Sequence, residues 1–235
     1  MSKNKFTQTA TAIIVAAGDS RRMGNSVNKQ FLLIDDIPVL AHALMSFDMA
    51  KSIDSVIIVA KPENILTIND LVREFNIAKV KTIVPGGKTR QESVMCGLKH
   101  INTECFVAVH DGARPFVTPE LIDNVVLAAY HHGAAAPGIV PKDTVKVANA
   151  ESLITETPDR NTLRLIQTPQ VFRADELKLA YIRAEESGFL STDDCSVIER
   201  IGIKIYITEG EYTNIKVTTP EDLSVAEAIC SYLKK

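Results

Sequence analysis

The feature that most limits how this chain can fold is a series of four short apolar runs in its first half. Each run is rich in valine and isoleucine and is continuous rather than alternating, which is typical of strands covered on both faces. Helix-like segments separate the runs, so their order predicts an α/β fold with a mostly parallel twisted sheet and helices on both faces. Such folds bind ligands at the carboxyl ends of their strands. The four predicted strands are Thr11–Ala16, Ser55–Ala60, Val80–Val84 and Cys105–His110.

Capping signals mark several helices, and the second half of the chain adds shorter strands. Pro62 suits the first turn of a helix over Glu63–Phe75, and Thr118 caps a second helix that opens with Pro119. Thr219 begins the last helix with a capping-box pattern. Further strands are expected at Ala134–Val140 and near Arg164–Gln167, Lys204–Thr208 and Asn214–Val217.

Residues 139–160 differ from the rest of the chain and predict a protruding β-arm. The stretch from Asp143 to Pro158 alternates apolar and polar residues around a polar turn at Asn149–Glu151, which predicts a projecting hairpin. An isolated two-stranded ribbon is marginal in water, so we expect this arm to pack on a second subunit. We find no linker or repeat, and therefore expect one domain over residues 11–235 behind a disordered polar tail at residues 1–10.

Composition restricts the classes of partner and the compartment. The 235 residues carry a formal net charge of −3, which gives no general attraction to nucleic acid or to an anionic membrane. No apolar run approaches the roughly 20 residues of a membrane span, and the first ten residues lack a signal-peptide core. The four cysteines form no C-x-x-C pair, which favours free thiols in a reducing compartment. We therefore expect a cytoplasmic protein.

The loop after the first strand is a candidate anion site. Ala16, Ala17 and Gly18 let the backbone approach a ligand closely, and successive N–H groups there can form an anion-binding nest. Arg22 and Lys29 place fixed positive charge beside them. The spacing fits neither a Walker A loop nor a dinucleotide-binding fingerprint. The alternative is a glycine turn with solvated arginines, which is common in α/β folds.

Two further segments could complete this site. Gly87 lies in a turn that feeds a helix, where Arg90 and Ser93 could contact a base, ribose or phosphate; a simple turn explains the pattern equally well. Asp111 follows the fourth strand and could hold Mg²⁺, which takes one or two carboxylates plus substrate phosphates. Arg114 could bind phosphate or brace Asp111, and a capped turn with an internal ion pair is the alternative.

Nine short motifs follow one another from Ala16 to Leu223. They read A-A-G-D-S-R-R-M-G, N-K-Q-F, G-G-K-T-R-Q-E-S-V, H-D-G-A-R-P, D-T-V-K, D-R-N-T-L, T-P-Q-V-F, T-D-D and N-I-K-V-T-T-P-E-D-L. Each alone is weak, but together, across nearly the whole chain, they resemble the 2-C-methyl-D-erythritol 4-phosphate cytidylyltransferases of non-mevalonate isoprenoid synthesis. The resemblance implies a Rossmann-like nucleotidyltransferase fold with a β-arm, acting as a homodimer. It also implies Mg²⁺-dependent transfer of CMP from CTP to the sugar-alcohol phosphate, with release of pyrophosphate.

The resemblance also implies roles by position. Arg22 and Lys29 would stabilise the transition state, Arg160 and Lys216 would position the acceptor phosphate, and Asp111 would contact the metal. Thr144 and Arg160, which flank the arm, resemble residues that reach the partner subunit's site. Thr168 and Thr192 would touch the acceptor. The residues expected to cradle CTP are Ala16, Ala17, Gly18, Gly87, Arg90 and Ser93, with Gly112 and Arg114 as further binding residues.

The expected reaction needs no general base, because an acceptor phosphate oxygen is already anionic near neutral pH. This agrees with the lack of an obvious Ser–His–Asp or Cys–His set. His110, at the end of the fourth predicted strand, is expected to be structural rather than a base. The chemistry instead requires positioning and opposing charge. Two departures from the family pattern are Asn28, where proline is usual, and Thr213, where aspartate is frequent.

Two rival functions are open. Ribitol 5-phosphate cytidylyltransferases share the chemistry, but their first loop typically reads A-G-G, and a small apolar residue stands where this chain has Asp159. The second rival is a non-catalytic nucleotide-binding module that kept the fold, since fold alone does not prove function. Against it stand the retained charged residues Arg22, Lys29, Asp111, Arg160 and Lys216.

Overall fold

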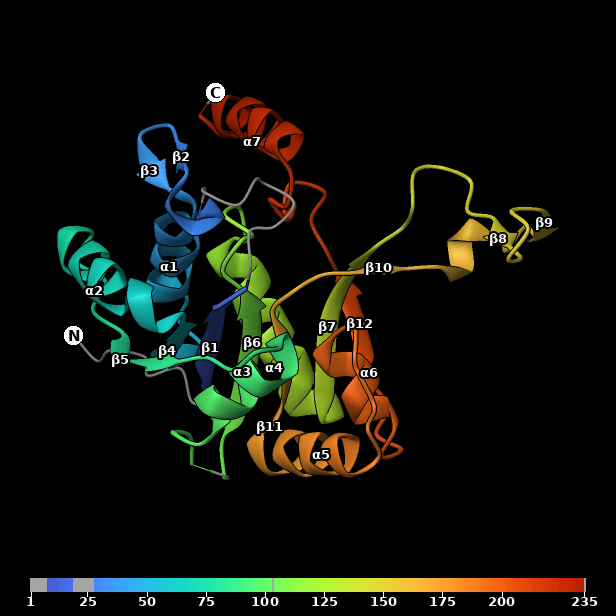
Figure 1. Ribbon diagram of the computed structural model, residues 1–235, viewed down its shortest axis with the longest axis horizontal. Helices are drawn as coiled ribbons and strands as arrows, with labels where there is room; N and C mark the ends of the chain where they lie inside the picture. The colour runs from blue at the N-terminus through green and yellow to red at the C-terminus, as the bar shows by residue number, and fades with distance from the viewer. Residues whose placement is uncertain (1–7, 19–27, 103, 235) are drawn as a thin grey trace.

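A sheet of eight strands forms the centre of the computed structural model, which describes residues 8–18, 28–102 and 104–234 (Figure 1). Its first half is parallel: β1 lies between β4 and β6, and β5 follows β4. The chain thus builds outward from β1 on one side and then crosses to the other, which creates a switch point between β1 and β6. The four strands are β1 (Ala10–Ala16), β4 (Ile53–Ala60), β5 (Val80–Pro85) and β6 (Phe106–Asp111).

The second half of the sheet is mixed. The strand β11 pairs antiparallel with both β6 and β7, and β10 pairs antiparallel with β7, whereas β12 runs parallel to β7. A cis peptide bond joins Thr168 and Pro169 between β10 and β11. These strands are β7 (Ala134–Ile139), β10 (Leu165–Ile166), β11 (Gln170–Arg173) and β12 (Tyr206–Glu209).

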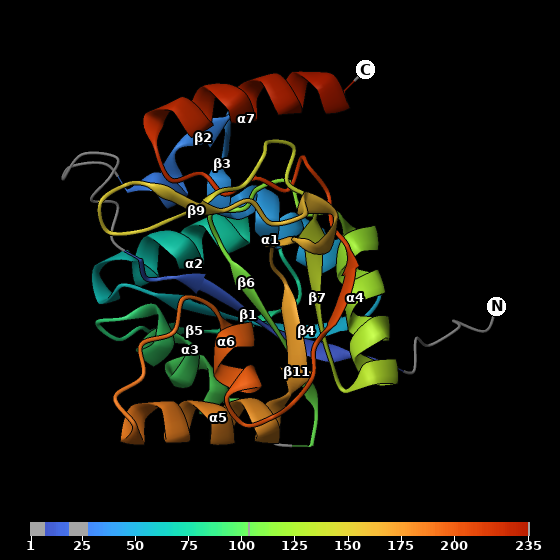
Figure 2. The same cartoon turned by 90° about the vertical axis from the view of Figure 1, so that its right-hand side faces the viewer.

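Helices cover both faces of the sheet, as Figure 2 shows. Alternate residues of β1 serve the two layers: Ile14 packs into the core beneath α1, α2 and α4, and Ile13 packs into the core beneath α3, α5 and α6. Burial on both sides explains why the strand is a continuous apolar run. The helices are α1 (Val39–Met49), α2 (Ile65–Glu74), α3 (Arg90–Leu98), α4 (Pro119–His132), α5 (Ala174–Glu186) and α6 (Asp194–Glu199).

A small satellite layer lies beyond the main sandwich. The helix α7 (Pro220–Leu233) packs on the hairpin of β2 (Leu33–Ile34) and β3 (Ile37–Pro38) through a separate apolar cluster that includes Phe116 and Val217. The predicted capping box is present, since the side chain of Asp222 accepts from the backbone N–H of Thr219. No helix in the described part of the chain is long and apolar enough to cross a bilayer.

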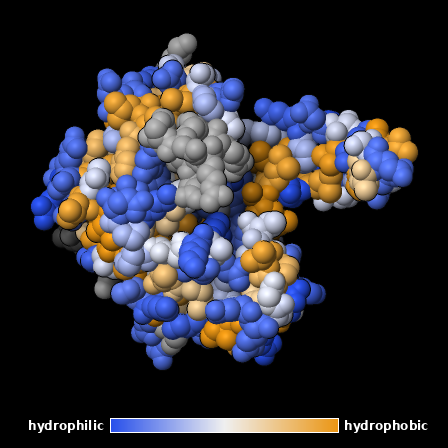
Figure 3. Space-filling view, viewed as in Figure 1, coloured by the Kyte–Doolittle hydropathy of each residue, from blue (hydrophilic) through white to orange (hydrophobic). Residues whose placement is uncertain are grey.

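The segment between β7 and β10 leaves the body of the molecule as an arm (Figure 1). At its end β8 (Val147–Ala148) and β9 (Ile154–Glu156) form an antiparallel pair around the turn. Leu153 and Ile154 are 60% and 64% exposed there, and apolar patches lie along the arm in Figure 3. Among the described residues, these two side chains belong to none of the buried apolar clusters.

The structure corrects several sequence-based expectations. Residues 214–217 form a loop rather than a strand, because their backbone bonds to turns and to the loop after β6 instead of to a neighbouring strand. The helix expected from Glu63 opens as a 3-10 turn at Pro62–Asn64 before α2. Of the predicted tail, residues 1–7 lie outside the described residues, while Ala10 already pairs in β1.

Candidate active site

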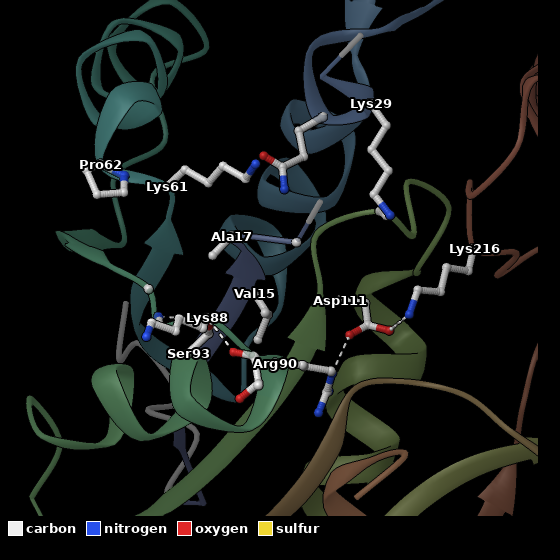
Figure 4. A pocket seen from close by; sticks show the side chains of 16 residues that line it. Val15, Ala17, Lys29, Lys61, Pro62, Lys88, Arg90, Ser93, Asp111 and Lys216 are labelled. Atoms are coloured by element: carbon white, nitrogen blue, oxygen red, sulfur yellow. Dashed lines mark hydrogen bonds and ion pairs between the residues drawn. The ribbon is translucent and has the colours of Figure 1, made fainter. Parts of the chain in front are cut away.

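A pocket of about 930 Å³ lies at the carboxyl ends of β1 and β6, at the switch point of the sheet (Figure 4). This is the edge where ligands of open α/β sheets bind. Its lining comes from the ends of β1, β4, β5 and β6, from the start of α3 and from the loop before α7. The predicted site residues that it brings together are Ala17, Gly18, Lys29, Gly87, Arg90, Ser93, Asp111 and Lys216.

Positive charge dominates this pocket. Four lysines and one arginine line it, against a single carboxylate, Asp111, among the described lining residues. Figure 4 shows Lys29 and Lys216 reaching in from one side and Lys61 from the other. Clustered cations at the end of a buried sheet are suited to an anionic ligand such as a triphosphate. The chain therefore concentrates cations locally although its net charge is −3.

Asp111, at the end of β6, is held between two cations. Its Oδ1 lies 3.1 Å from Nε of Arg90 and its Oδ2 lies 2.7 Å from Nζ of Lys216. Burial alone would raise the pKa of Asp111, but the charges of Arg90 and Lys216 outweigh burial and hold that pKa far below its usual value. The carboxylate is therefore ionised at any pH near neutrality.

Arg90, the first residue of α3, joins Asp111 to a second carboxylate that the sequence analysis did not single out. Its Nη2 lies 2.7 Å from Oδ2 of Asp194, which is fully buried. The hydroxyl of Tyr181 donates to the other oxygen of Asp194. Burial lowers the pKa of Arg90, but both carboxylates outweigh it and raise that pKa well above the usual value. The T-D-D motif, which ends at Asp194, was the available signal for a functional carboxylate here.

The turn after β5 packs closely against the end of β1. A Cβ added to Gly86 would lie 2.5 Å from Cβ of Ala17 and 2.8 Å from Oγ of Ser93. The Ser93 hydroxyl accepts from the backbone N–H of Gly87 at 3.2 Å, and Thr89 caps α3 with its own hydroxyl. These contacts hold the predicted nucleotide-cradling residues in one wall of the pocket.

Lys216 belongs to a loop that buried polar groups fix in place. Asn214 is fully buried, and its Nδ2 donates to the carbonyl of Thr168 at 3.0 Å. A guanidinium nitrogen of Arg114 donates to the carbonyl of Asn214 at 2.6 Å, and burial lowers the pKa of Arg114. Arg114 therefore lies behind the pocket lining and anchors the Lys216 loop, where the sequence analysis had left phosphate binding open.

His110 and Thr168 lie beneath the pocket floor. Oγ1 of Thr168 lies 3.0 Å from Nδ1 of His110 and accepts from the backbone N–H of Asp111 at 3.2 Å. Burial lowers the pKa of His110 to about 3, so the imidazole is neutral. The His110 ring packs against Phe47 with 4.9 Å between centroids, and Gly112 donates its N–H to β1. These residues support Asp111 from below.

Lys29 opens a short 3-10 helix, Lys29–Phe31, beside the end of β1. Asn28 caps this helix, since its side chain accepts from the backbone N–H of Gln30 at 3.3 Å. The Gln30 amide donates to the carbonyl of Ala16. Asparagine at position 28 thus contributes a cap that proline could not. Lys61, which directly follows β4, also lines the pocket, and its place after a predicted strand was the signal for it.

Several predicted site residues lie away from the pocket or outside the described residues. Arg22 falls in the segment 19–27, which is not described. Arg160 and Thr144 belong to the arm and are exposed, and a guanidinium nitrogen of Arg160 donates to the carbonyl of Lys142 at 3.0 Å. Thr192 is exposed and does not line the pocket.

The pocket offers a metal ion one carboxylate. Among the described residues no group of three or more metal-binding side chains occurs. A single ionised carboxylate among cations suits Mg²⁺, which keeps several waters and takes its remaining ligands from substrate phosphates. Asp111 fits this pattern, provided that one of its two ion pairs opens.

Comparison with known proteins gives one consistent result. The chain matches the model of the IspD family, described as 2-C-methyl-D-erythritol 4-phosphate cytidylyltransferase, over residues 10–232. A protein of that name from Caldanaerobacter subterraneus is 48% identical over 219 residues, which cover 92% of this chain and 96% of the relative. Another from Clostridium botulinum is 43% identical over 234 residues, covering 99% of this chain and all of the relative.

Solved structures agree with these sequence matches. A crystal structure described as 4-diphosphocytidyl-2C-methyl-D-erythritol synthase from Anaerococcus prevotii superposes with a TM-score of 0.85 at 32% identity, covering 97% of both chains. A 2-C-methyl-D-erythritol 4-phosphate cytidylyltransferase from Thermus thermophilus gives a TM-score of 0.75 at 30% identity, covering 95% of this chain and 99% of the other. The predicted α/β fold and the family resemblance are confirmed.

Proposed function

This chain belongs to the 2-C-methyl-D-erythritol 4-phosphate cytidylyltransferase family, and from that premise we propose that it transfers CMP from CTP to 2-C-methyl-D-erythritol 4-phosphate. The products are 4-diphosphocytidyl-2-C-methyl-D-erythritol and pyrophosphate. The observation that carries the proposal is the pocket at the end of the sheet, which Lys29 lines and in which Arg90 and Lys216 pair with Asp111. Two anionic substrates must approach each other there, and clustered cations offset their repulsion.

The reaction requires positioning and charge rather than a base. A phosphate oxygen of the acceptor attacks the α-phosphorus of CTP, and pyrophosphate leaves with the electron pair of the broken P–O bond. The attacking oxygen is already anionic, so no proton needs to be removed. The described residues agree with this, because His110 is buried and neutral beneath the floor. Lys29 and Arg22 would oppose the charge that develops on the reacting phosphate groups.

Mg²⁺ fits this proposal through Asp111. When bound, Mg²⁺ would neutralise phosphate charge and polarise the P–O bonds of CTP. Asp111 would hold the ion, and Lys216 would position the acceptor phosphate. Because both oxygens of Asp111 are paired in the structure, metal binding would require one of its two ion pairs, with Arg90 or with Lys216, to open.

The arm supports a homodimer in which each arm serves its partner. Its apolar residues Leu153 and Ile154 are exposed, and the arm points away from the body of its own chain (Figure 1). Arg160 and Thr144 lie on this arm rather than at the pocket. In a twofold dimer the same residues would meet the pocket of the other subunit. Dimer formation would also cover the apolar tip. We place this activity in the cytoplasm, without a nucleic acid or membrane partner.

A pyrophosphate-release assay tests the proposed activity. The protein is incubated with Mg²⁺, with each of the four nucleoside triphosphates, and with either 2-C-methyl-D-erythritol 4-phosphate or ribitol 5-phosphate. We expect release only when CTP and the erythritol derivative are present together. Preferential release with ribitol 5-phosphate would assign the sister activity. Binding of CTP without release under any combination would overturn the catalytic proposal.

A further inference from the structure

The unassigned feature closest to the pocket is the carboxylate of Asp194. Asp194 is the first residue of α6, is fully buried, and does not line the pocket itself. Its backbone N–H donates to Oε1 of Gln170 at 3.0 Å, which fixes the start of α6 against β11. The side chain accepts from Tyr181 on one oxygen and pairs with Arg90 on the other at 2.7 Å.

A buried carboxylate in this position is not needed for packing alone. Burial of charge carries a large desolvation cost, and well-packed apolar residues often stabilise a fold as well as a buried ion pair does. Among the described residues, Arg90 is the cation that forms an ion pair with Asp194. The pair therefore has an effect beyond packing, which is to fix the orientation of the Arg90 guanidinium group.

Arg90 is held at two points of its guanidinium group. Nη2 faces Asp194 in the core, and Nε faces Asp111 at the pocket floor, 3.1 Å from Oδ1. The second oxygen of Asp111 then faces Lys216. Four side chains of alternating charge thus form a row from the core to the pocket: Asp194, Arg90, Asp111 and Lys216. Figure 4 shows the three that line the pocket, from Arg90 to Lys216.

We propose that Asp194 is a positioning residue for the reaction: by fixing Arg90 from behind, it holds Asp111 in the orientation that the pocket uses. This inference rests on the proposed function and adds a residue that touches no substrate. Without the charge of Asp194, the guanidinium is free to rotate and to take both oxygens of Asp111 as a bidentate pair. Asp111 would then be withdrawn from metal and from Lys216.

The test is an Asp194→Asn variant, which keeps the shape of the side chain and removes its charge. We expect kcat to fall about 10- to 100-fold, as is usual when the partner of a ligating carboxylate is removed. The KM for CTP should change by less than about threefold, because the cations that attract the nucleotide remain. Calorimetry without acceptor should show that Mg²⁺ strengthens CTP binding less in the variant than in the wild type.

A double-mutant cycle with Arg90→Gln separates positioning from general stabilisation. If Asp194 acts through Arg90, Asp194→Asn should cost little further activity in the Arg90→Gln background. The matched control is Asp123→Asn. Asp123 is a partly buried carboxylate remote from the pocket that accepts from the backbone N–H and hydroxyl of Ser52 at 2.8 and 2.6 Å. It should alter thermal stability without altering kcat.

Tyr181→Phe provides a second route if Asp194→Asn does not fold. This variant removes the hydroxyl that donates to Asp194 and keeps every charge, so we expect a smaller fall in kcat in the same direction. The inference is overturned if folded Asp194→Asn or Tyr181→Phe protein turns over at the wild-type rate, or if the Asp194→Asn effect is undiminished in the Arg90→Gln background. An inactive wild-type protein would instead overturn the proposed function, which distinguishes the two failures.

Discussion

Two neighbouring residues at the end of β6, His110 and Asp111, differ in charge state because their surroundings differ. Asp111 faces the pocket, and Arg90 and Lys216 keep it charged. His110 points the other way into the core, where burial lowers its pKa to about 3 and keeps it neutral. Alternation along the strand thus separates a group that meets the ligand from a group that supports the floor. Substitution of Asp111 should therefore affect metal binding and turnover, whereas substitution of His110 should affect the stability of the fold.

Lys29 is proposed to stabilise the charge of the transition state, so its removal should have a clear effect on kcat. Lys29→Ala removes a cation at the pocket without touching the sheet, and we expect kcat to fall on the order of 10²–10³-fold. Steady-state pyrophosphate release measures this, with thermal unfolding as the check on the fold. An unchanged kcat would remove Lys29 from the chemistry.

His110 predicts a pH dependence of stability. Its pKa is about 3 in the folded protein and about 6.5 in an unfolded chain, so the unfolded state binds more protons between these values. Stability therefore falls as pH drops below 6.5, by about 1.4 kcal/mol per pH unit. Between pH 7.5 and 5.5, without added metal, the wild type should lose about 1.4 kcal/mol more unfolding free energy than His110→Asn.

Urea unfolding of both proteins at the two pH values gives this difference directly. Burial also raises the pKa of Glu211, but Glu211 is present in both proteins, so its contribution cancels. Equal pH sensitivity of the wild type and His110→Asn would show that the imidazole is accessible to protons in the folded state.

Among the elements, those with strong local patterns could be predicted from the sequence. The four continuous apolar runs became β1, β4, β5 and β6, because burial on both faces leaves a plain signature. The strand β11, with only four residues, was not predicted, since its antiparallel place between β6 and β7 depends on distant segments. The loop at Asn214 was mistaken for a strand, because its β-branched residues resemble one while its hydrogen bonds go elsewhere.

Contacts between distant segments also limited what could be predicted of the site. Lys29, Asp111 and Lys216 are far apart in the sequence, and it was the family resemblance that implied their joint role. The position of Asp194 behind Arg90 could not be predicted, because a buried ion pair leaves no periodic pattern. Arg90 itself was expected to cradle CTP. Its pairing with two carboxylates emerges only from the fold, which brings the end of β6 and the start of α6 to the first residue of α3.

The turn between β5 and α3 gives an element-scale prediction. Gly86→Ala would place a Cβ 2.5 Å from Ala17 and 2.8 Å from Ser93, so the turn must move away from the end of β1. We expect a loss of about 1–3 kcal/mol in unfolding free energy and a higher KM for CTP, because this turn forms one wall of the pocket. Denaturant unfolding and steady-state kinetics measure the two effects, and a variant with unchanged stability and KM would show that the turn adapts freely.

At the scale of the whole molecule, the predicted site residues fall into two parts, the body and the arm. The body supplies the pocket with Lys29 and Lys216, whereas the arm carries Arg160 away from it. The apolar residues at the arm's end are exposed, and the proposed dimer would cover them. If the partner is a second copy of this chain, each complete site contains residues from both subunits.

Shared sites predict complementation between two defective variants. Lys29→Ala damages the body, and Arg160→Ala damages the arm, so each homodimer has only defective sites. In a mixed dimer, the Arg160→Ala body receives the intact arm of the Lys29→Ala subunit and forms one complete site, while the other site carries both defects. Random mixing makes half of the dimers mixed, so co-refolding should restore about a quarter of wild-type turnover at limiting acceptor. If Arg160 served its own chain, every mixed dimer would have one defect per site, and the mixture would be no more active than the average of its parents.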